Sequence, residues 1–179
     1  MNFKNFFRLT FCFGLAILGC SKDNAVSEEF TPTKQEQISS RGATQISGIG
    51  FYAEPDECNA VEDASFALRM TGDLEGCHYV FVDFFECSPS GTYRESGREY
   101  FVGTYHEEAG TFWTEYRFEA KFEDCSEDGS YLGLEIFGRC QHPIVKGSGT
   151  GVFEGVTGRL DFKDDIAAGN FPYRGHLNF

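Results

Sequence analysis

The chain has 179 residues and is strongly acidic, with 28 aspartates and glutamates against 15 lysines and arginines and a formal net charge of −13. This charge excludes nucleic acid as the expected partner, because binding to phosphates requires a basic face. The length suits one domain that buries its own hydrophobic core. The 20 phenylalanines can form much of that core.

The N-terminus predicts a signal for export. Basic residues precede an apolar run over 11–18 that is too short to span a bilayer. Residues 17–20 read ILGC, which resembles the lipobox of bacterial lipoproteins, in which the cysteine thiol receives a diacylglycerol and a peptidase cuts before it. Residues 1–19 are therefore predicted to be a cleaved signal peptide and Cys20 the lipid attachment site. An ordinary secretory signal is the alternative.

Residues 20–44 are predicted to be a lipidated flexible tether, since they are mostly polar and show no periodicity. Within them, residues 21–24 resemble the short lysine-plus-acid tags that send some bacterial lipoproteins to the cell surface. The expected location is the outer membrane or the cell surface. The N-terminal lipid makes the membrane the expected partner, and a second acyl chain would make this anchor durable.

From Gln45 onward the sequence predicts antiparallel strands. Apolar and polar residues alternate with a period of two, turn residues recur at short intervals, and no convincing helical pattern is present. In 111–122 the even-numbered residues are mainly aromatic and the odd-numbered ones mainly polar, which indicates one buried and one solvated face. A loop is expected over 88–97. The expected strands cover residues 46–52, 64–71, 77–87, 98–106, 111–122, 131–139, 149–154, 157–163 and 171–178.

Consecutive short strands with hairpin spacing favour an all-β fold, a small antiparallel up-and-down barrel of about eight strands. Closure into a barrel is expected because it removes the exposed edges of the sheet. A two-sheet β-sandwich is the alternative architecture. The predicted barrel domain spans residues 45–179.

Five cysteines follow Cys20, and export to an oxidising compartment makes disulfides their expected state, with at least one thiol left over. A strand over 77–87 is about 33 Å long, whereas bridged α-carbons lie within about 7 Å, so its two cysteines cannot pair with each other. In a meander the five cysteines fall near the two ends of the barrel, and bridges are expected only within each group. The groups are Cys58, Cys87 and Cys125 at one end, and Cys77 and Cys140 at the other.

Zinc is the competing explanation for these cysteines, because His78 follows Cys77 and His142 lies two residues after Cys140. No Cys-x-x-Cys or His-x-x-x-His spacing supports a zinc site. The glycine-rich segment near residue 150 is not a phosphate loop, since it lacks the Lys-Ser/Thr ending and no helix follows. We therefore expect neither a metal nor a cofactor.

Residues 147–164, which read GSGTGVFEGVTGRLDFKD, combine closely spaced glycines with core residues. The first glycines allow positive φ angles or a close backbone approach, Phe153 is expected to anchor the core, and 155–158 to form a tight hairpin. Leu160 and Phe162 are expected to point inward on the return strand.

This segment resembles the glycine-rich hairpin of the allene oxide cyclase-like barrels, which are related in shape to plant dirigent proteins. In those families a Gly-Gly-x-Gly-x-Phe-x-Gly stretch precedes a similar return strand, and a last strand ending in Tyr-x-x-x-Leu follows, as in 171–177 here. The resemblance covers about residues 145–179. It implies a small eight-stranded barrel with an apolar interior, often trimeric, so a homo-oligomer is one expectation. The matched residues are scaffold glycines and core aromatics, and no catalytic role carries over.

Two functions are open from the sequence. The first is a non-catalytic, lipid-anchored binding or interaction module whose barrel takes a small apolar ligand. The aromatic content and the lack of a recognisable nucleophile, metal or cofactor motif favour it. The alternative is an allene oxide cyclase-like isomerase or cyclase that acts on a small apolar substrate, an argument by analogy with the family.

For the enzyme, Asp83 and Glu86 are candidate acid–base residues. They lie in the aromatic run 80–86, where at least one face must be buried and a desolvated carboxyl group could transfer protons. Tyr116, on the apolar face of its strand, is a candidate for orienting a ligand. The simpler explanations are that the two carboxyl groups face solvent and that Tyr116 is a core residue. Surface positions are expected for His106, His142 and His176.

Overall fold

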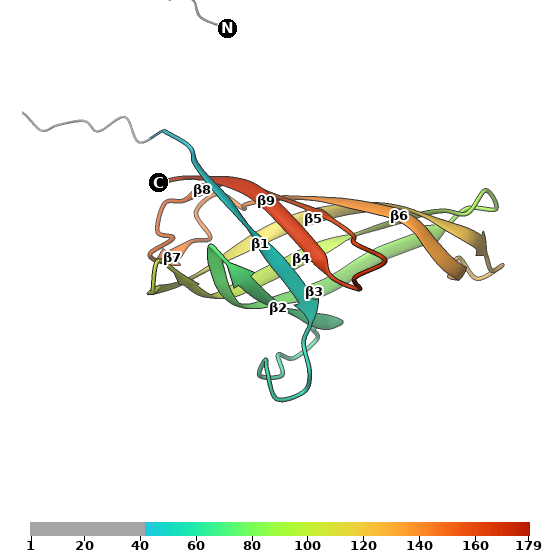
Figure 1. Cartoon of the computed structure of the whole chain (residues 1–179), viewed down its shortest axis with the longest axis horizontal. Helices are drawn as coiled ribbons and strands as arrows, with labels where there is room; N and C mark the ends of the chain where they lie inside the picture. Colours follow the sequence, from blue (N-terminus) through green and yellow to red (C-terminus); the bar gives the residue numbers. More distant parts are fainter. Residues whose placement is uncertain (1–41) are drawn as a thin grey trace, which may run out of the picture. The chain divides into compact units, whose positions relative to one another are not determined.

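The computed structural model describes residues 42–179, which form nine antiparallel β-strands and no helix (Figure 1). The predicted signal peptide, Cys20 and most of the predicted tether lie outside the described residues. No helix able to cross a membrane is found in residues 42–179. The strands are β1 (Thr44–Tyr52), β2 (Phe66–Gly72), β3 (Leu74–Cys87), β4 (Thr92–Tyr105), β5 (Glu108–Cys125), β6 (Tyr131–Pro143), β7 (Thr150–Gly151), β8 (Thr157–Lys163) and β9 (Phe171–Asn178).

The strands form one sheet that closes into a barrel. The order along the sheet is β4-β3-β2-β1-β9-β8-β6-β5, and the pairing of β4 with β5 joins the two ends. Eight strands thus make the barrel, and β7 is a short extra strand that pairs with β5. The predicted antiparallel barrel is confirmed, and the sandwich alternative is wrong.

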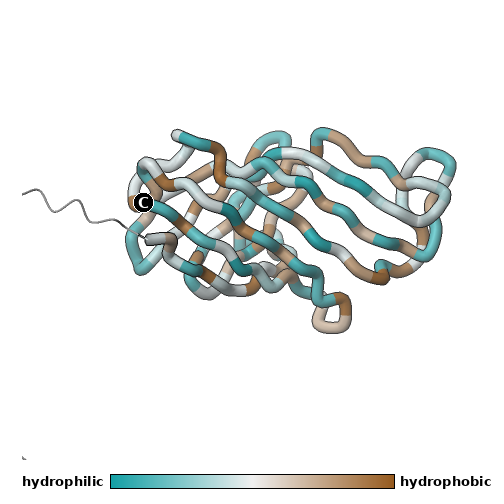
Figure 2. The backbone as a smooth tube through the Cα atoms, turned by 90° about the horizontal axis from the view of Figure 1, so that it is seen from above, coloured by the Kyte–Doolittle hydropathy of each residue, from teal (hydrophilic) through white to brown (hydrophobic). Residues whose placement is uncertain are grey.

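The alternation predicted over 111–122 is confirmed in β5. Phe112, Thr114 and Tyr116 are buried, whereas Glu115 and Arg117 between and beside them are exposed. Figure 2 shows the same alternation of hydrophobic and hydrophilic residues along the neighbouring strands. Each strand therefore gives one face to the barrel interior and one to solvent.

Several predicted strand boundaries differ from the structure, most of all those of β4 and β7. β4 begins at Thr92, inside the predicted loop, because the turn before it is tight and uses Gly91 at a φ of +78°. Gly97 is a strand residue, and a Cβ there would lie 2.0 Å from the carbonyl oxygen of Phe81 on β3. The strand expected over 149–154 is only two residues long, since the chain turns at Gly151, whose φ is +60°.

The barrel strands differ in length, and the long ones continue beyond one end of the barrel (Figure 1). β3 pairs with β2 only as far as Val80, and β6 pairs with β8 only from Arg139 onward. The remaining parts, residues 81–87, 92–98, 115–125 and 131–138, form a four-strand extension. Its exposed apolar side chains are Phe84, Phe85, Tyr131, Leu132, Leu134, Ile136 and Phe137.

The end of the barrel near the C-terminus is filled by packed aromatic and aliphatic side chains. Phe153, the predicted core anchor, is fully buried and packs at 4.9 Å between ring centroids against Phe112, which in turn stacks on Phe101. Leu74 and Leu177 are also fully buried in this cluster. This end is therefore closed by its own core.

Two disulfides are present among the described residues, and Cys140 is a buried free thiol. Cys87 pairs with Cys125, within one of the predicted groups, and ties β3 to β5 in the four-strand extension. Cys58 pairs with Cys77, which contradicts the prediction that bridges form only within the groups.

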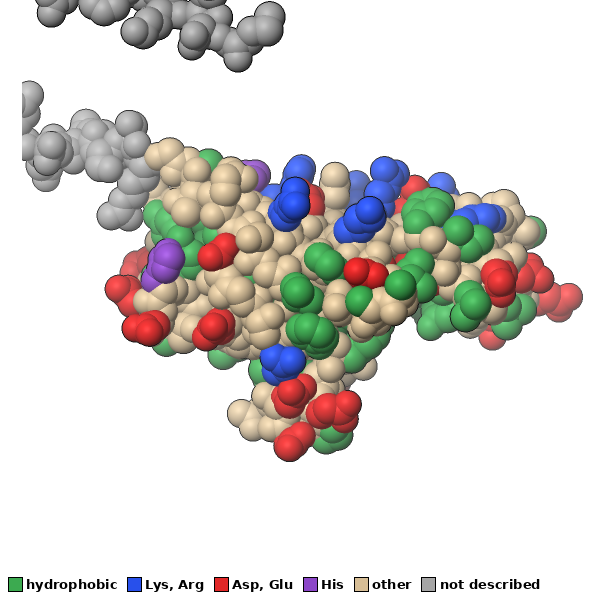
Figure 3. Space-filling view, viewed as in Figure 1, with side chains coloured by type: hydrophobic (Ala, Val, Ile, Leu, Met, Phe, Trp, Pro, Cys, Tyr) green, Lys and Arg blue, Asp and Glu red, His purple; other side chains and the backbone are tan. Residues whose placement is uncertain are grey.

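The error arises from the β1–β2 loop, residues 53–65. This loop does not stay at the barrel end but folds against the outer face of β3, where Cys58 packs with Tyr79 and Phe81. Cys77 lies on that same outer face and therefore meets Cys58. Figure 3 shows the acidic side chains that this loop carries on its solvent side, at the bottom of the view.

Candidate ligand cavity

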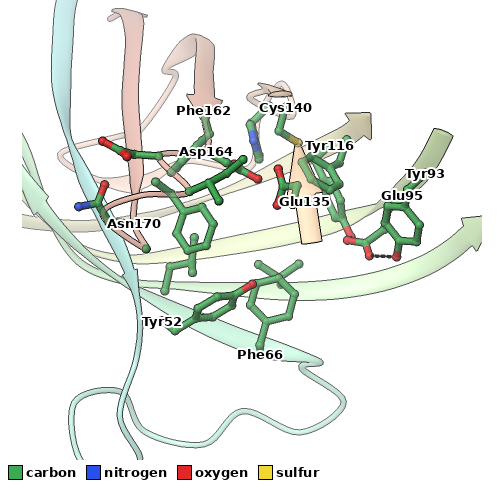
Figure 4. A pocket seen from close by; sticks show the side chains of 18 of the residues that line it. Tyr52, Phe66, Tyr93, Glu95, Tyr116, Glu135, Cys140, Phe162, Asp164 and Asn170 are labelled. Atoms are coloured by element: carbon green, nitrogen blue, oxygen red, sulfur yellow. Dashed lines mark hydrogen bonds between the residues drawn. The ribbon is translucent and has the colours of Figure 1, made fainter. Parts of the chain in front are cut away.

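A cavity of about 560 Å³ lies at the open end of the barrel, opposite the closed end, and continues along the four-strand extension (Figure 4). All eight barrel strands and the loop 164–170 contribute to its wall. Tyr52, Tyr131 and Ile166 line it and are exposed, so they mark its mouth. The volume lies in the range of pockets that hold small molecules. Its aromatic lining residues are Tyr52, Phe66, Tyr93, Tyr116, Phe118, Phe122, Tyr131, Phe162 and Phe171.

A buried polar cluster lies between the cavity and the closed end. It consists of His78 on β3, Glu99 on β4, Thr114 on β5 and His142 on β6, each at most 4% exposed. These four strands are consecutive in the sheet, and each places one inward side chain in the cluster. Glu99 and His142 line the cavity, whereas His78 packs toward Phe101 of the closed end.

Glu99 is the centre of this cluster. Its Oε2 accepts hydrogen bonds from Thr114 Oγ1 at 2.5 Å and from His142 Nδ1 at 2.5 Å, and His78 Nε2 lies 3.1 Å away. Burial by itself raises the pKa of Glu99, but the two histidines lower it by more, so its pKa lies well below the ordinary value. Glu99 is therefore an ionised carboxylate that can only accept hydrogen bonds.

The ionised state of Glu99 assigns the tautomer of His142. Because the carboxylate has no proton to give, the proton in the short contact belongs to His142 Nδ1. The other ring nitrogen of His142, Nε2, is buried and has no hydrogen-bond partner. The ring of His142 lies 4.6 Å from that of Phe162 and is stacked on Tyr116.

Glu95 forms a second polar group on the cavity wall. Its two carboxylate oxygens accept hydrogen bonds from the hydroxyls of Tyr93, at 2.6 Å, and Tyr116, at 2.7 Å (Figure 4). Burial, followed by the hydrogen bond to Glu95, raises the pKa of both phenols far above the usual value. Both tyrosines therefore stay protonated and hold Glu95 in place.

Glu135 and Asp164 form a carboxyl pair on the cavity wall, where Figure 4 shows them close to each other. Burial, and then the neighbouring Asp164, raises the pKa of Glu135 to about 7. Burial also raises the pKa of Asp164. Two adjacent carboxyl groups cannot both ionise easily, so this pair retains a proton near neutral pH.

The cavity is acidic as well as aromatic. Carboxyl side chains line it, and no lysine or arginine within residues 42–179 does so. Cys140 also lines it, and burial, followed by the charge of Glu99, raises the pKa of its thiol far above the usual value. The acidic lining residues are Glu95, Glu99, Glu135, Asp164 and Asp165.

Of the three candidate residues from the sequence, only Tyr116 lies in the cavity. Asp83 and Glu86 are exposed, and Asp83 pairs with Arg98 at 3.3 Å on the outside of the four-strand extension. The structure therefore does not bring the three residues together. A β-bulge between Val82 and Phe84 interrupts the simple alternation in this part of β3.

The main polar groups of the cavity were not predicted from the sequence. The surface position expected for His142 is wrong, since this residue is buried and contributes to the cluster. Glu95 was missed because residues 88–97 resemble a loop. Glu99 lies inside the predicted strand 98–106, where the period of two already places it on the face of Phe101. His78 shares the inward face of Val80 in the same way.

The donor set of His78, Glu99 and His142 is the one group in residues 42–179 that could hold a metal ion, with its donor atoms within 4.8 Å of one another. Two imidazoles and a carboxylate suit zinc or iron. Donors bound tetrahedrally at about 2.1 Å from an ion are roughly 3.4 Å apart. The separation of 2.5 Å between Glu99 Oε2 and His142 Nδ1 is that of a hydrogen bond. As placed, the residues form a hydrogen-bonded cluster and do not fit a coordination shell.

Comparisons with protein-family models and with curated proteins find no match to this chain. The resemblance of residues 145–179 to the allene oxide cyclase-like barrels therefore stays a prediction.

Proposed function

We propose that this chain is an exported, lipid-anchored protein whose barrel binds a small, largely apolar molecule that carries no negative charge. The cavity of about 560 Å³ is the observation that carries the binding function. Protein interiors are normally close-packed, whereas the aromatic side chains of this interior leave a space that a ligand can fill. The lipobox-like residues 17–20 support the anchor, and the two disulfides support an oxidising compartment.

The acidic lining supports the choice of ligand charge. A carboxylate ligand would face Glu99 and the Glu135–Asp164 pair with no lysine or arginine from the described residues to compensate. Bringing an anion into this cavity would therefore cost both desolvation and repulsion. A neutral ring compound with one polar group loses little on transfer and gains aromatic contacts.

The test is binding of Nile red, an uncharged apolar dye whose fluorescence rises in apolar surroundings. Val80→Phe places a larger side chain on the cavity wall, since Val80 lines the cavity on β3. Val102→Phe is the matched control, because Val102 is an exposed residue on the neighbouring strand β4. We expect Val80→Phe to weaken dye binding about tenfold or more and Val102→Phe to leave it unchanged. Equal binding by all three proteins would contradict an internal site.

A further inference from the structure

We infer that His142, held by Glu99, is a general base and that the cavity moves a proton between two atoms of a bound carbon acid. The inference rests on the proposed function, because the substrate must occupy the cavity. It adds a reaction to a binding site. The substrate class is a small, uncharged ketone or a related apolar compound with an acidified C–H bond.

The first support is the fixed orientation of the imidazole. His142 Nδ1 donates to Glu99 at 2.5 Å, and Glu99 is in turn held by Thr114. This arrangement gives one tautomer and one ring position, and it stabilises the imidazolium that forms when Nε2 takes a proton.

The second support is the unused nitrogen. His142 Nε2 is buried without a hydrogen-bond partner, on a side chain that lines the cavity. Leaving a buried polar atom unpaired costs free energy, and such atoms in native proteins call for an explanation. A ligand bound in the cavity would supply that partner, next to the rings of Phe162 and Tyr116 that pack against the imidazole.

The third support is a proton donor on the same wall. The Glu135–Asp164 pair retains a proton near neutral pH. Two groups of opposite function thus share one cavity, as acid–base catalysis requires. Cys140 lies between Glu135 and His142 on β6 and also lines the cavity. The base and the carboxyl pair are therefore joined by a continuous stretch of the cavity wall.

The reaction balances without an oxidant or a cofactor. His142 Nε2 takes the proton of a C–H bond next to a carbonyl group, and the electron pair of that bond forms the carbon–carbon double bond of the enol. The carbonyl oxygen takes a proton from the Glu135–Asp164 pair. Transfer of a proton from His142 Nε2 back to carbon, with return of the enol O–H proton to the Glu135–Asp164 pair, regenerates the ketone and both starting protonation states. Exchange of the Nε2 proton with water through the cavity mouth before this return places a solvent hydrogen on the carbon.

Two probes test this step with the whole protein. The first is 2-tetralone in heavy water, whose α-protons are replaced by deuterium when the ketone enolises. The second is 5-nitrobenzisoxazole: the base removes its ring C–H proton, the electron pair forms a nitrile, and the N–O bond breaks to release a coloured phenolate. We expect both rates to exceed that of free imidazole at equal concentration by about a hundredfold.

The variants assign the rate to His142. His142→Gln should lower both rates about a hundredfold, whereas His176→Gln, a change on a partly exposed histidine of β9, should leave them unchanged. Glu99→Gln should lower them about tenfold or more, since Glu99 is a positioning residue. Nitrogen NMR gives the readout that a purely structural role would not move: His142 should carry its proton on Nδ1, and Glu99→Gln should reduce that preference.

The outcomes separate this inference from the proposed function. Nile red bound in the cavity, with neither probe converted faster by the protein than by His142→Gln, would overturn the inference and leave the binding function intact. Zinc bound one to one and lost in both His78→Ala and His142→Ala would also overturn it, because the histidines would then be ligands. If His142→Gln does not fold, the rate and the tautomer in Glu99→Gln decide. If Glu99→Gln has the same rates as the native protein and an unchanged His142 tautomer, His142 is not the proposed general base.

Discussion

Glu99 Oε2 lies 2.5 Å from His142 Nδ1, although the two residues are 43 positions apart in the chain and come from strands separated in the sheet by β5. The contact exists only when β4, β5 and β6 are paired in their native register. Glu99 therefore connects the stability of the barrel to the chemistry of its cavity.

Replacing Glu99 should destabilise the fold. Glu99→Ala removes the acceptor for Thr114 and His142, and buried groups left without partners cost about 3 kcal/mol of the free energy of unfolding. Urea denaturation measures the change. Glu86→Ala, on an exposed side chain, should change the same quantity by less than about 0.5 kcal/mol. Similar losses for the two variants would show that the cluster contributes no special stability.

The Glu135–Asp164 pair should make stability depend on pH. The folded-state pKa of Glu135 is raised to about 7 from 4.5, so its contribution is fully present below 4.5 and is lost as the pH rises through about 7. Glu135→Gln removes this loss. We compare the free energy of unfolding of Glu135→Gln with that of the native chain at two pH values. After discounting for partial exposure, this difference should favour the variant by roughly 1 kcal/mol more at about pH 8 than at about pH 4.5.

Thermal unfolding across this pH range gives the measurement. Glu108→Gln is a suitable control, because Glu108 is exposed at the start of β5, away from the cavity wall. A stability difference for Glu135→Gln that does not change with pH would contradict the shared proton.

Cys140 should resist alkylation in the folded protein. Its side chain is buried and its thiol pKa is raised, and both effects suppress the reactive thiolate. Iodoacetamide followed by mass spectrometry of the peptide that contains Cys140 should show little label under native conditions and full label in denaturant. Rapid native labelling would show that the cavity wall opens at this strand.

Ligand charge should decide which ring compounds enter the cavity. We expect 2-naphthol to displace Nile red and 2-naphthoate, which has the same ring system with a carboxylate, to do so at least about tenfold less well. Fluorescence titration measures both. Glu99→Gln should reduce the discrimination, because it removes one negative charge from the lining. Equal competition by the two compounds would contradict the proposed ligand class.

The barrel itself was predictable because the period of two is a local property of the sequence. The alternation in β5 and the inward placement of Leu160 and Phe162 in β8 follow from it directly. The polar cluster was not predictable in the same way, because its members lie on four strands and meet only through long-range register. The Cys58–Cys77 bridge escaped prediction for a similar reason, since the path of the loop 53–65 is set by packing on β3.

The closed end gives the barrel the form of a cup and not of a channel. With Phe101, Phe112 and Phe153 filling the far end, a molecule held inside leaves through the opening by which it came. Residence time is then governed by the side chains around that opening, Tyr52, Tyr131 and Ile166, because the packed far end leaves no second opening among residues 42–179. Such a shape suits a protein that retains or transforms what it holds and returns it to the same side.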